Sequence, residues 1–312
     1  MVVLPLHRRK VIELLHTNIG RYHLGKAGIP GVPAWVAISL LFLLMTLVHL
    51  LAQVAGDYRT NATGTWNWNT VANWQVYNGA AWLAATDFPG QNAGTGTVTI
   101  QNNTNVILNI TPANPIGALT IATGNWNSSV QFAGANGLEV SGSVTLNVPN
   151  ANNIDKYIAV NNGSLICATI SMANTGGNTS DCYVSINNGT VRVTGNIAMA
   201  GSNLRNYILF TGDGTLFVGG NLSGGGLTSA SGGGASPPTS GTVNFNGSGN
   251  QTIGAYNFYN LTISGNRDAN NVTLINNGSI GIAGTFLPEA TFTTGGYVVT
   301  NNTINFNGTG NQ

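Results

Sequence analysis

A repeat of about 26 residues constrains the fold of this chain more than any other feature of its sequence. Each unit has an Asn-Gly or Asp-Gly turn flanked by alternating apolar residues. Four such glycines recur at almost equal spacing: Gly137, Gly163, Gly189 and Gly214. Short strands recurring at a fixed period are typical of solenoids, in which each unit packs only on its neighbours. The repeat therefore predicts an all-β chain of stacked coils.

The predicted fold is a parallel β-helix, or β-solenoid, over residues 96–312. Two or three short strands would form one coil, and successive coils would stack about 4.8 Å apart, the spacing of hydrogen-bonded strands. About eight coils would give a rod on the order of 40 Å long. A β-sandwich also has many short strands but needs no fixed period, so it is the less favoured alternative. Asparagines at equivalent turns are expected to form hydrogen-bonded ladders.

Two features modify the repeat. The sequence Thr-Val-Asn-Phe-Asn-Gly that begins at Thr242 returns as Thr-Ile-Asn-Phe-Asn-Gly from Thr303, as a longer copy that spans more than one unit. Residues 223–241 are rich in glycine and serine and interrupt the pattern. Such a composition predicts a flexible loop that bulges from one coil.

The charge distribution excludes several classes of function. Only 6% of the residues are charged, the net charge is +1, and all four histidines lie before residue 50. A basic surface for nucleic acid is therefore not expected. Without histidine, the repeat region cannot build the usual catalytic triads or most metal sites. We expect no cofactor and no bound metal.

Residues 1–56 have the order of an export signal. Five basic residues precede an apolar run from about residue 35 to residue 51, and Ala52, Ala55 and Gly56 are possible cleavage points. A basic region followed by an apolar region and small residues is typical of a signal peptide. The apolar run is also close to the ~20 residues that span a bilayer, so an uncleaved anchor helix is the alternative. Either way, the remainder of the chain is predicted to be extracellular or on the outer cell surface, with membrane contact only through this segment.

Residues 57–95 form a distinct aromatic module. Trp66, Trp68, Trp74 and Trp82 cluster there, and Asn78-Gly79 predicts a hairpin turn that would bring Trp74 opposite Trp82. A solenoid exposes unpaired backbone at its first coil, so we interpret the module as a cap. Stacking of a sugar on exposed tryptophan is the alternative.

The opening sequence Gly56-Asp57-Tyr58-Arg59, the tryptophan cluster and units such as residues 241–253 resemble a known class of surface protein. It comprises large repeat-rich proteins that Gram-negative bacteria secrete by the type IX route, and the units are also similar to autotransporter passenger repeats. The resemblance covers most of residues 56–312 through low-complexity motifs. It implies a structural or adhesive role, with surface glycans or other cell-surface proteins as partners. Such proteins end in a sorting domain, which is not recognisable here, so we expect the chain to be truncated within a repeat.

One predicted column of charged residues is a candidate catalytic site. Asp155 and Asp181 are one repeat apart, and Arg205 follows at nearly the same interval, so the three should lie on neighbouring coils. Paired acids with a basic partner could perform acid–base chemistry, as in a polysaccharide-active β-helix enzyme, or hold a cation. The alternative is that Arg205 only compensates the repulsion between the two acids.

A second predicted column contains Tyr157, Tyr183 and Tyr207, each at the start of an alternating strand. Because the following Ile and Val residues form the better inward set, the tyrosines should point outward as an exposed aromatic stripe. Such a stripe beside polar groups suits a sugar chain and predicts a carbohydrate-binding module. A stack that merely covers the coils is the alternative. The same parity places Cys167 and Cys182 inward, either as core thiols or as one disulfide.

Overall fold

The computed structural model describes residues 53–173, 179–200, 205–231 and 236–309. The chain divides into two units, Met1–Ala52 and Gln53–Gln312. Almost all of the predicted signal or anchor segment therefore lies outside the described residues. Among the residues that are described, none belongs to a helix of the length and apolarity that a membrane crossing requires.

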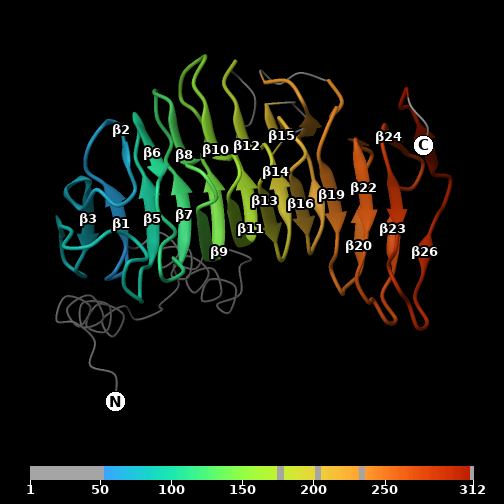
Figure 1. Ribbon diagram of the computed structural model, residues 1–312, viewed down its shortest axis with the longest axis horizontal. Helices are drawn as coiled ribbons and strands as arrows, with labels where there is room; N and C mark the ends of the chain where they lie inside the picture. The colour runs from blue at the N-terminus through green and yellow to red at the C-terminus, as the bar shows by residue number, and fades with distance from the viewer. Residues whose placement is uncertain (1–52, 174–178, 201–204, 232–235, 310–312) are drawn as a thin grey trace, which may run out of the picture. The chain divides into compact units, whose positions relative to one another are not determined.

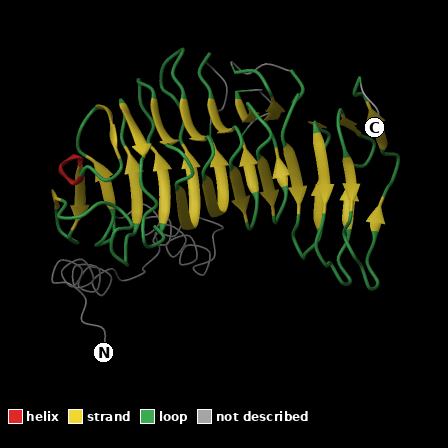
Figure 2. Cartoon of the chain, in the orientation of Figure 1, coloured by secondary structure: helices red, strands yellow, loops and turns green. Residues whose placement is uncertain are grey.

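The second unit is an all-β solenoid of about eight turns. Parallel strands succeed one another along its length, from the blue strands at the start of this unit to the red ones near the C-terminus (Figure 1). One 3-10 turn, η1 (Val71–Asn73), is the single helical element in the described ranges, and strands and loops make up the rest (Figure 2). The prediction of a β-solenoid is confirmed.

A 14-stranded sheet forms one face along nearly the whole solenoid. It is parallel except at its first edge, where β1 pairs with β3 and β3 with β4 in antiparallel fashion. Its strands are β1 (Tyr58–Thr60), β3 (Trp74–Tyr77), β4 (Trp82–Ala84), β5 (Thr97–Ile100), β7 (Ala118–Ile121), β9 (Gly137–Leu146), β11 (Ser164–Met172), β13 (Thr190–Val193), β14 (Ile197–Met199), β16 (Thr215–Val218), β17 (Leu222–Ser223), β19 (Thr242–Phe245), β22 (Asn260–Ile263) and β25 (Phe286–Pro288).

Three smaller sheets complete the coils. A seven-stranded sheet contains β2 (Gly64–Asn67), β6 (Thr104–Leu108), β8 (Ser128–Phe132), β10 (Lys156–Val160), β12 (Cys182–Ile186), β15 (Asn206–Phe210) and β18 (Gly226–Thr228). Near the C-terminus, two three-stranded sheets contain β20 (Gln251–Ile253), β23 (Val272–Leu274) and β26 (Tyr297–Val298), and β21 (Asn257–Phe258), β24 (Ser279–Ile282) and β27 (Thr303–Phe306).

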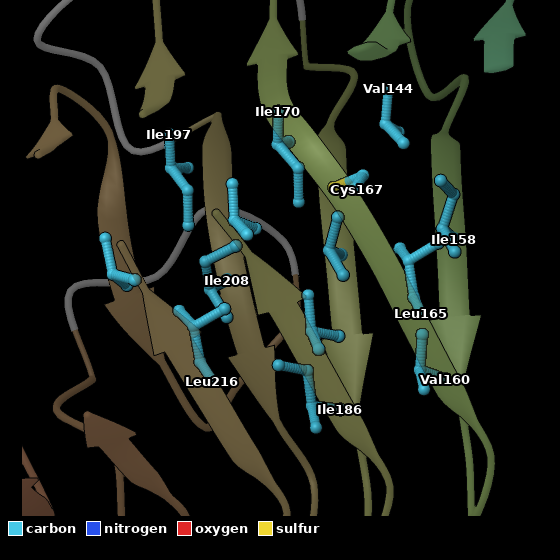
Figure 3. Packing of buried hydrophobic residues seen from close by; sticks show 14 of the residues in the cluster. Val144, Ile158, Val160, Leu165, Cys167, Ile170, Ile186, Ile197, Ile208 and Leu216 are labelled. Atoms are coloured by element: carbon cyan, nitrogen blue, oxygen red, sulfur yellow. The ribbon is translucent and has the colours of Figure 1, made fainter. Parts of the chain in front are cut away.

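The core lies between the sheets and follows from period-two alternation. Ile158, Val184 and Ile208 are in register on β10, β12 and β15, and all three are buried. Leu165 and Leu216 of the large sheet point toward them from the other side (Figure 3). Each fully buried Ile, Leu or Val contributes about 1.5–3 kcal/mol, so a continuous column of them stabilises the stack strongly.

The repeat length is regular only in the middle of the solenoid. One coil runs from Leu165 to its partner Val191, whereas a much shorter coil runs from Val243 to its partner Leu261. The predicted alignment of glycines holds for Gly163, Gly189 and Gly214, each of which directly precedes a strand in register with the next. It is wrong for Gly137, which pairs with Ser164.

A β-bulge explains that exception. Val140 pairs with Cys167 and Ser143 with Thr169, so β9 holds one residue more than β11 over the same length. An extra residue of this kind shifts everything before it by one position. The two members of the longer sequence copy lie in different sheets, because Thr242 belongs to the large sheet and Thr303 to the sheet of β21, β24 and β27. Equal sequence letters there do not occupy equivalent faces.

The aromatic module contains the predicted hairpin with a different pairing. Trp82 pairs with Tyr77, and their ring centroids are 5.3 Å apart, so the prediction that Trp82 lies opposite Trp74 is wrong. The turn is longer than a two-residue Asn-Gly turn, because β3 ends at Tyr77 and β4 begins only at Trp82, and this moves the register along. Trp74 is instead buried, and its ring lies 5.1 Å from that of Trp68 and 5.2 Å from that of Trp66.

Candidate functional site

The predicted charged column, Asp155, Asp181 and Arg205, forms on successive coils. Each residue directly precedes a strand of the seven-stranded sheet, and β10, β12 and β15 are paired in register. The amide of Lys156 donates to the carbonyl of Asp181 at 2.9 Å, and the amide of Cys182 donates to that of Arg205 at 2.8 Å. The backbone ladder thus extends to the charged residues themselves and places them one above the other.

Asp181 is the central and most buried member, with 4% of its surface exposed. Its Oδ1 lies 3.2 Å from Nη1 of Arg205, in an ion pair. Its Oδ2 accepts a hydrogen bond of 3.1 Å from the hydroxyl of Tyr207. Both carboxylate oxygens are therefore engaged by groups of the next coil, which is how a buried carboxylate is normally compensated.

Asp155 lies in an environment that disfavours the ionised form of its carboxyl. Burial raises the pKa of its carboxyl, and the negative charge of Asp181 raises it further. The backbone amide of Asp181 and the charge of Arg205 act in the opposite direction. The net effect raises the pKa of the Asp155 carboxyl and favours its protonated form. In the described ranges, no group of three or more His, Cys, Asp or Glu side chains could hold a metal ion.

The three tyrosines form a stack of parallel rings, the tyrosine ladder. The ring centroids of Tyr157 and Tyr183 are 5.0 Å apart with an interplanar angle of 3°, and those of Tyr183 and Tyr207 are 5.1 Å apart with an angle of 2°. Gln131 donates to the hydroxyl of Tyr157 at 2.9 Å. Because both faces of Tyr183 are covered by its neighbours, only ring edges and hydroxyls remain for any ligand.

The prediction that the stripe is exposed is wrong for Tyr207, which is only 1% exposed, whereas Tyr157 and Tyr183 are half-buried. The hydroxyl of Tyr207 reaches back toward Asp181 of the preceding coil instead of toward solvent. Burial raises the pKa of Tyr183, and the carboxylate of Asp155 is the next largest cause. The alternation of side chains correctly placed the tyrosines on the outer face of the sheet. It did not reveal that Tyr207 is covered on that face.

The two cysteines are core thiols. Cys167 lies on β11 of the large sheet and Cys182 on β12 of the seven-stranded sheet, and both are buried in the thiol form. The disulfide alternative is thus not formed. Burial raises the pKa of Cys167 to about 12, which makes its thiolate inaccessible at neutral pH.

Lys156 is an unusual residue that the sequence interpretation missed. It occupies an inward position of β10, in register with Ser128 and Cys182, and none of its surface is exposed. Its Nζ donates to the carbonyl of Trp126 at 2.6 Å and to Oγ of Ser128 at 3.3 Å. Burial lowers its pKa to about 8. The alternation of Lys156 with Ile158 was the signal that could have found it.

Arg267 repeats this arrangement in the C-terminal coils. It is fully buried, although arginine is rarely buried without compensating partners. Its Nη2 donates to the carbonyls of Phe245 at 2.7 Å and Ser264 at 3.1 Å. Gln251 makes the same kind of hydrogen bond to the preceding coil. Its Nε2 donates to the carbonyl of Val218 at 2.8 Å. These inward donors satisfy main-chain carbonyls where a strand of the large sheet ends.

The asparagine ladders are built differently from the prediction. A side-chain pair does join Asn188 to Asn162, at 3.4 Å. More often, the amide oxygen of an asparagine accepts a backbone N–H of the next coil. Oδ1 of Asn196 accepts from the amide of Asn221 at 2.8 Å, and Oδ1 of Asn221 accepts from that of Thr252 at 2.8 Å. The asparagines therefore extend the backbone ladder around the corners.

The charged column and the tyrosine ladder together make one network on the outer side of β10, β12 and β15. Most of its hydrogen-bonding and stacking capacity is used within the protein. No protein-family model, curated protein or solved structure matches this chain.

Proposed function

We propose that this protein is an extracellular or cell-surface structural rod with an adhesin-like role. The observation that carries the proposal is the position of Tyr183, whose two faces are covered by Tyr157 and Tyr207. Aromatic and charged groups that could have bound a ligand instead join one coil to the next. A chain that uses such groups to hold its own coils together is suited to maintaining a shape.

The two N-terminal segments of the chain fit the same role. Residues 57–95 act as a cap, because Trp68 and Trp74 are buried at the first coil and β3 and β4 pair with the edge of the large sheet. Residues 1–56 act as the export signal or anchor. Polar side chains on the outer faces then present a surface to glycans or to other cell-surface proteins.

Surface display tests this function. Cells that express the full chain with a C-terminal epitope should lose the epitope when protease is added to intact cells. The matched control carries Leu41→Arg and Leu44→Arg, which interrupt the apolar run and should leave the epitope protected inside. Protection of the epitope in the unmodified chain would reject the cell-surface role. Purified chain that fails to adhere to any cell or glycan surface would remove the adhesive part.

A second candidate, cleavage of a polysaccharide, is favoured by one observation only. The raised pKa of Asp155 is a property of general acids, and Asp181 lies on the neighbouring coil. Polysaccharide cleavage by the unmodified chain that is lost in both Asp155→Asn and Asp181→Asn would support it. If the unmodified chain releases no products from a panel of acidic and neutral polysaccharides, the enzyme hypothesis is rejected.

A further inference from the structure

The stack of parallel strands is interrupted between β17 and β20. On one part of the large sheet, β16 pairs in register with β19, so that face continues from coil to coil. On the other part, β17 pairs with β14 and with no other described strand, and β20 begins a separate sheet with β23. The corner before β20 comprises residues 246–250, whereas the corner before β17 comprises only residues 219–221. The two consecutive coils therefore differ in length where the sheet is interrupted.

The interruption leaves backbone groups without partners. The amide of Ile197 on β14 donates to the carbonyl of Asn221 at 2.8 Å, so the N–H and C=O of Leu222 point away from β14 and toward β20. A continued ladder would join the carbonyl of Leu222 to the amide of Gly254, but neither group has a hydrogen-bond partner within the described part of the chain. An acceptor and a donor of the main chain are therefore available to a ligand.

A groove with a volume of about 560 Å³ lies at this interruption, within the usual size range of ligand sites. Tyr256 fixes its shape, because the hydroxyl donates to the carbonyl of Gly224 at 2.7 Å and the ring meets that of Phe258 edge to face. Burial raises the pKa of Tyr256 to about 12, so the hydroxyl stays protonated at neutral pH. A Cβ at Gly254 would lie 2.8 Å from the tyrosine ring, so the ring position requires glycine there.

The lining of the groove is amphipathic and uncharged. The described residues that form it include no Asp, Glu, Lys or Arg. A charged ligand would lose its hydration there without gaining a countercharge, so the groove favours a neutral one. Apolar and polar side chains alternate around it together with three glycines and Tyr256. They are Asn221, Leu222, Ser223, Thr252, Ala255 and Ile275.

Two side chains cross the interruption and exclude an extended peptide from it. Oδ1 of Asn221 accepts from the amide of Thr252 at 2.8 Å, and the hydroxyl of Tyr256 reaches the carbonyl of Gly224. A β-strand inserted between β17 and β20 would have to break both bonds. A compact ligand can keep them. Sugar rings combine apolar C–H faces with hydroxyl groups at their edges, which matches apolar contacts next to a main-chain donor and acceptor.

We infer that this groove binds a neutral sugar residue of a glycan, an inference that rests on the adhesive role proposed above and gives it a site. The carbonyl of Leu222 accepts a hydrogen bond from a sugar hydroxyl, and the amide of Gly254 donates to a sugar oxygen. The side chain of Ala255 contacts the apolar face of the ring. The site is separate from the tyrosine ladder, where the faces of Tyr183 are covered by the neighbouring rings.

Binding of the full chain to immobilised oligosaccharides, in one detergent throughout, tests the site. The neutral probes are cellotetraose, maltotetraose, xylotetraose and chitotetraose, and the acidic probes are sialyllactose and oligogalacturonate. The unmodified chain should bind at least one neutral probe, and Ala255→Trp, which fills the groove, should weaken that binding at least about tenfold. The matched control is Ala135→Trp, at an exposed alanine in a turn outside the groove, and it should bind like the unmodified chain. Equal melting temperatures of the two variants exclude misfolding as the cause.

Each other outcome overturns the inference and separates it from the proposed function. Undiminished binding by Ala255→Trp would reject the groove and leave the adhesive role standing. Binding of the acidic probes alone would reject a neutral ligand. If the unmodified chain binds none of the probes, the glycan site is rejected, while the protease test of surface display still decides the cell-surface role.

Hydrogen exchange supplies a second readout that does not depend on the folding of a variant. In the unmodified chain, a saturating concentration of the bound neutral probe should slow the exchange of the Gly254 amide at least about tenfold, because the sugar becomes its acceptor. Amides of β10 should exchange at the same rate with and without the probe. An unchanged rate for Gly254 in the saturated protein would contradict the proposed site.

Discussion

The hydroxyl of Tyr207 donates a hydrogen bond of 3.1 Å to Oδ2 of Asp181, which lies one coil earlier. Tyr207 is also the end of the tyrosine ladder, and Asp181 is the partner of Arg205. This single bond therefore joins the aromatic and charged columns into one network. Four predictions test what that network and the buried lysine contribute.

Tyr207→Phe should lower the free energy of unfolding by about 1.5–3 kcal/mol, because it removes a buried hydrogen bond to a charged acceptor while keeping the ring. Chemical denaturation measures the change. The control is Tyr77→Phe, at a half-buried tyrosine whose contact is ring packing with Trp82, and its effect should stay within about 0.5 kcal/mol. Equal effects of the two substitutions would show that the bond to Asp181 contributes nothing specific.

Tyr183→Ala should cost about 2–4 kcal/mol of unfolding free energy, because it removes two ring contacts and leaves a gap in the ladder. Ser185→Ala, further along the same face of β12, should change it by less than about 0.5 kcal/mol. The Tyr183→Ala and Ser185→Ala variants should bind equally to a glycan array, since the faces of Tyr183 are not available to a sugar. Selective loss of glycan signal in Tyr183→Ala would instead identify the ladder as a binding site.

The two acids should respond oppositely to neutralisation at pH 7. Asp155→Asn should leave the stability unchanged or increased, because burial and the charge of Asp181 both disfavour the ionised form. Asp181→Asn should cost about 1–3 kcal/mol, because Arg205 and Tyr207 lose a charged acceptor. Thermal unfolding of the two variants side by side measures this. A larger loss of stability for Asp155→Asn than for Asp181→Asn would contradict this prediction.

Lys156 should make the stability of the protein depend on pH. Its pKa is lowered from 10.5 to about 8 in the folded chain, so between these values the unfolded chain binds more protons. The contribution of Lys156 to stability therefore rises with pH in this window, by about 1–2 kcal/mol between pH 8 and 9.5. Cys167 acts in the opposite sense, because its pKa is raised and the unfolded chain loses that proton first.

The difference in unfolding free energy between the unmodified chain and Lys156→Met isolates the lysine, since the contribution of Cys167 cancels. This difference should shift in favour of the unmodified chain as pH increases from 8 to 9.5. A difference that stays constant over this range would mean that the buried amine does not titrate there.

The repeat period was sufficient to predict the solenoid and the vertical neighbours within it. Ile158 above Val184, and Asp155 above Asp181, follow from a spacing that two consecutive coils share. The prediction failed where a coil changed length. The bulge in β9 displaces Gly137, and the coil that runs from Val243 to Leu261 is much shorter than the repeat. A single extra residue is invisible in a glycine spacing, but it shifts by one position the pairings of β9 that precede the bulge.

The alternation of residues along each strand was enough to assign inward and outward side chains, because side chains of a strand point to opposite faces with a period of two. That rule placed Tyr157 and Tyr183 on the outer side and could have placed Lys156 on the inner side. The burial of Tyr207 against Asp181 and the inward turn of Arg267 to main-chain carbonyls became visible only in the folded chain. Burial and hydrogen-bond partners depend on corner lengths and on the adjacent coils. Those are contacts between residues distant in sequence, and alternation within one strand carries no information about them.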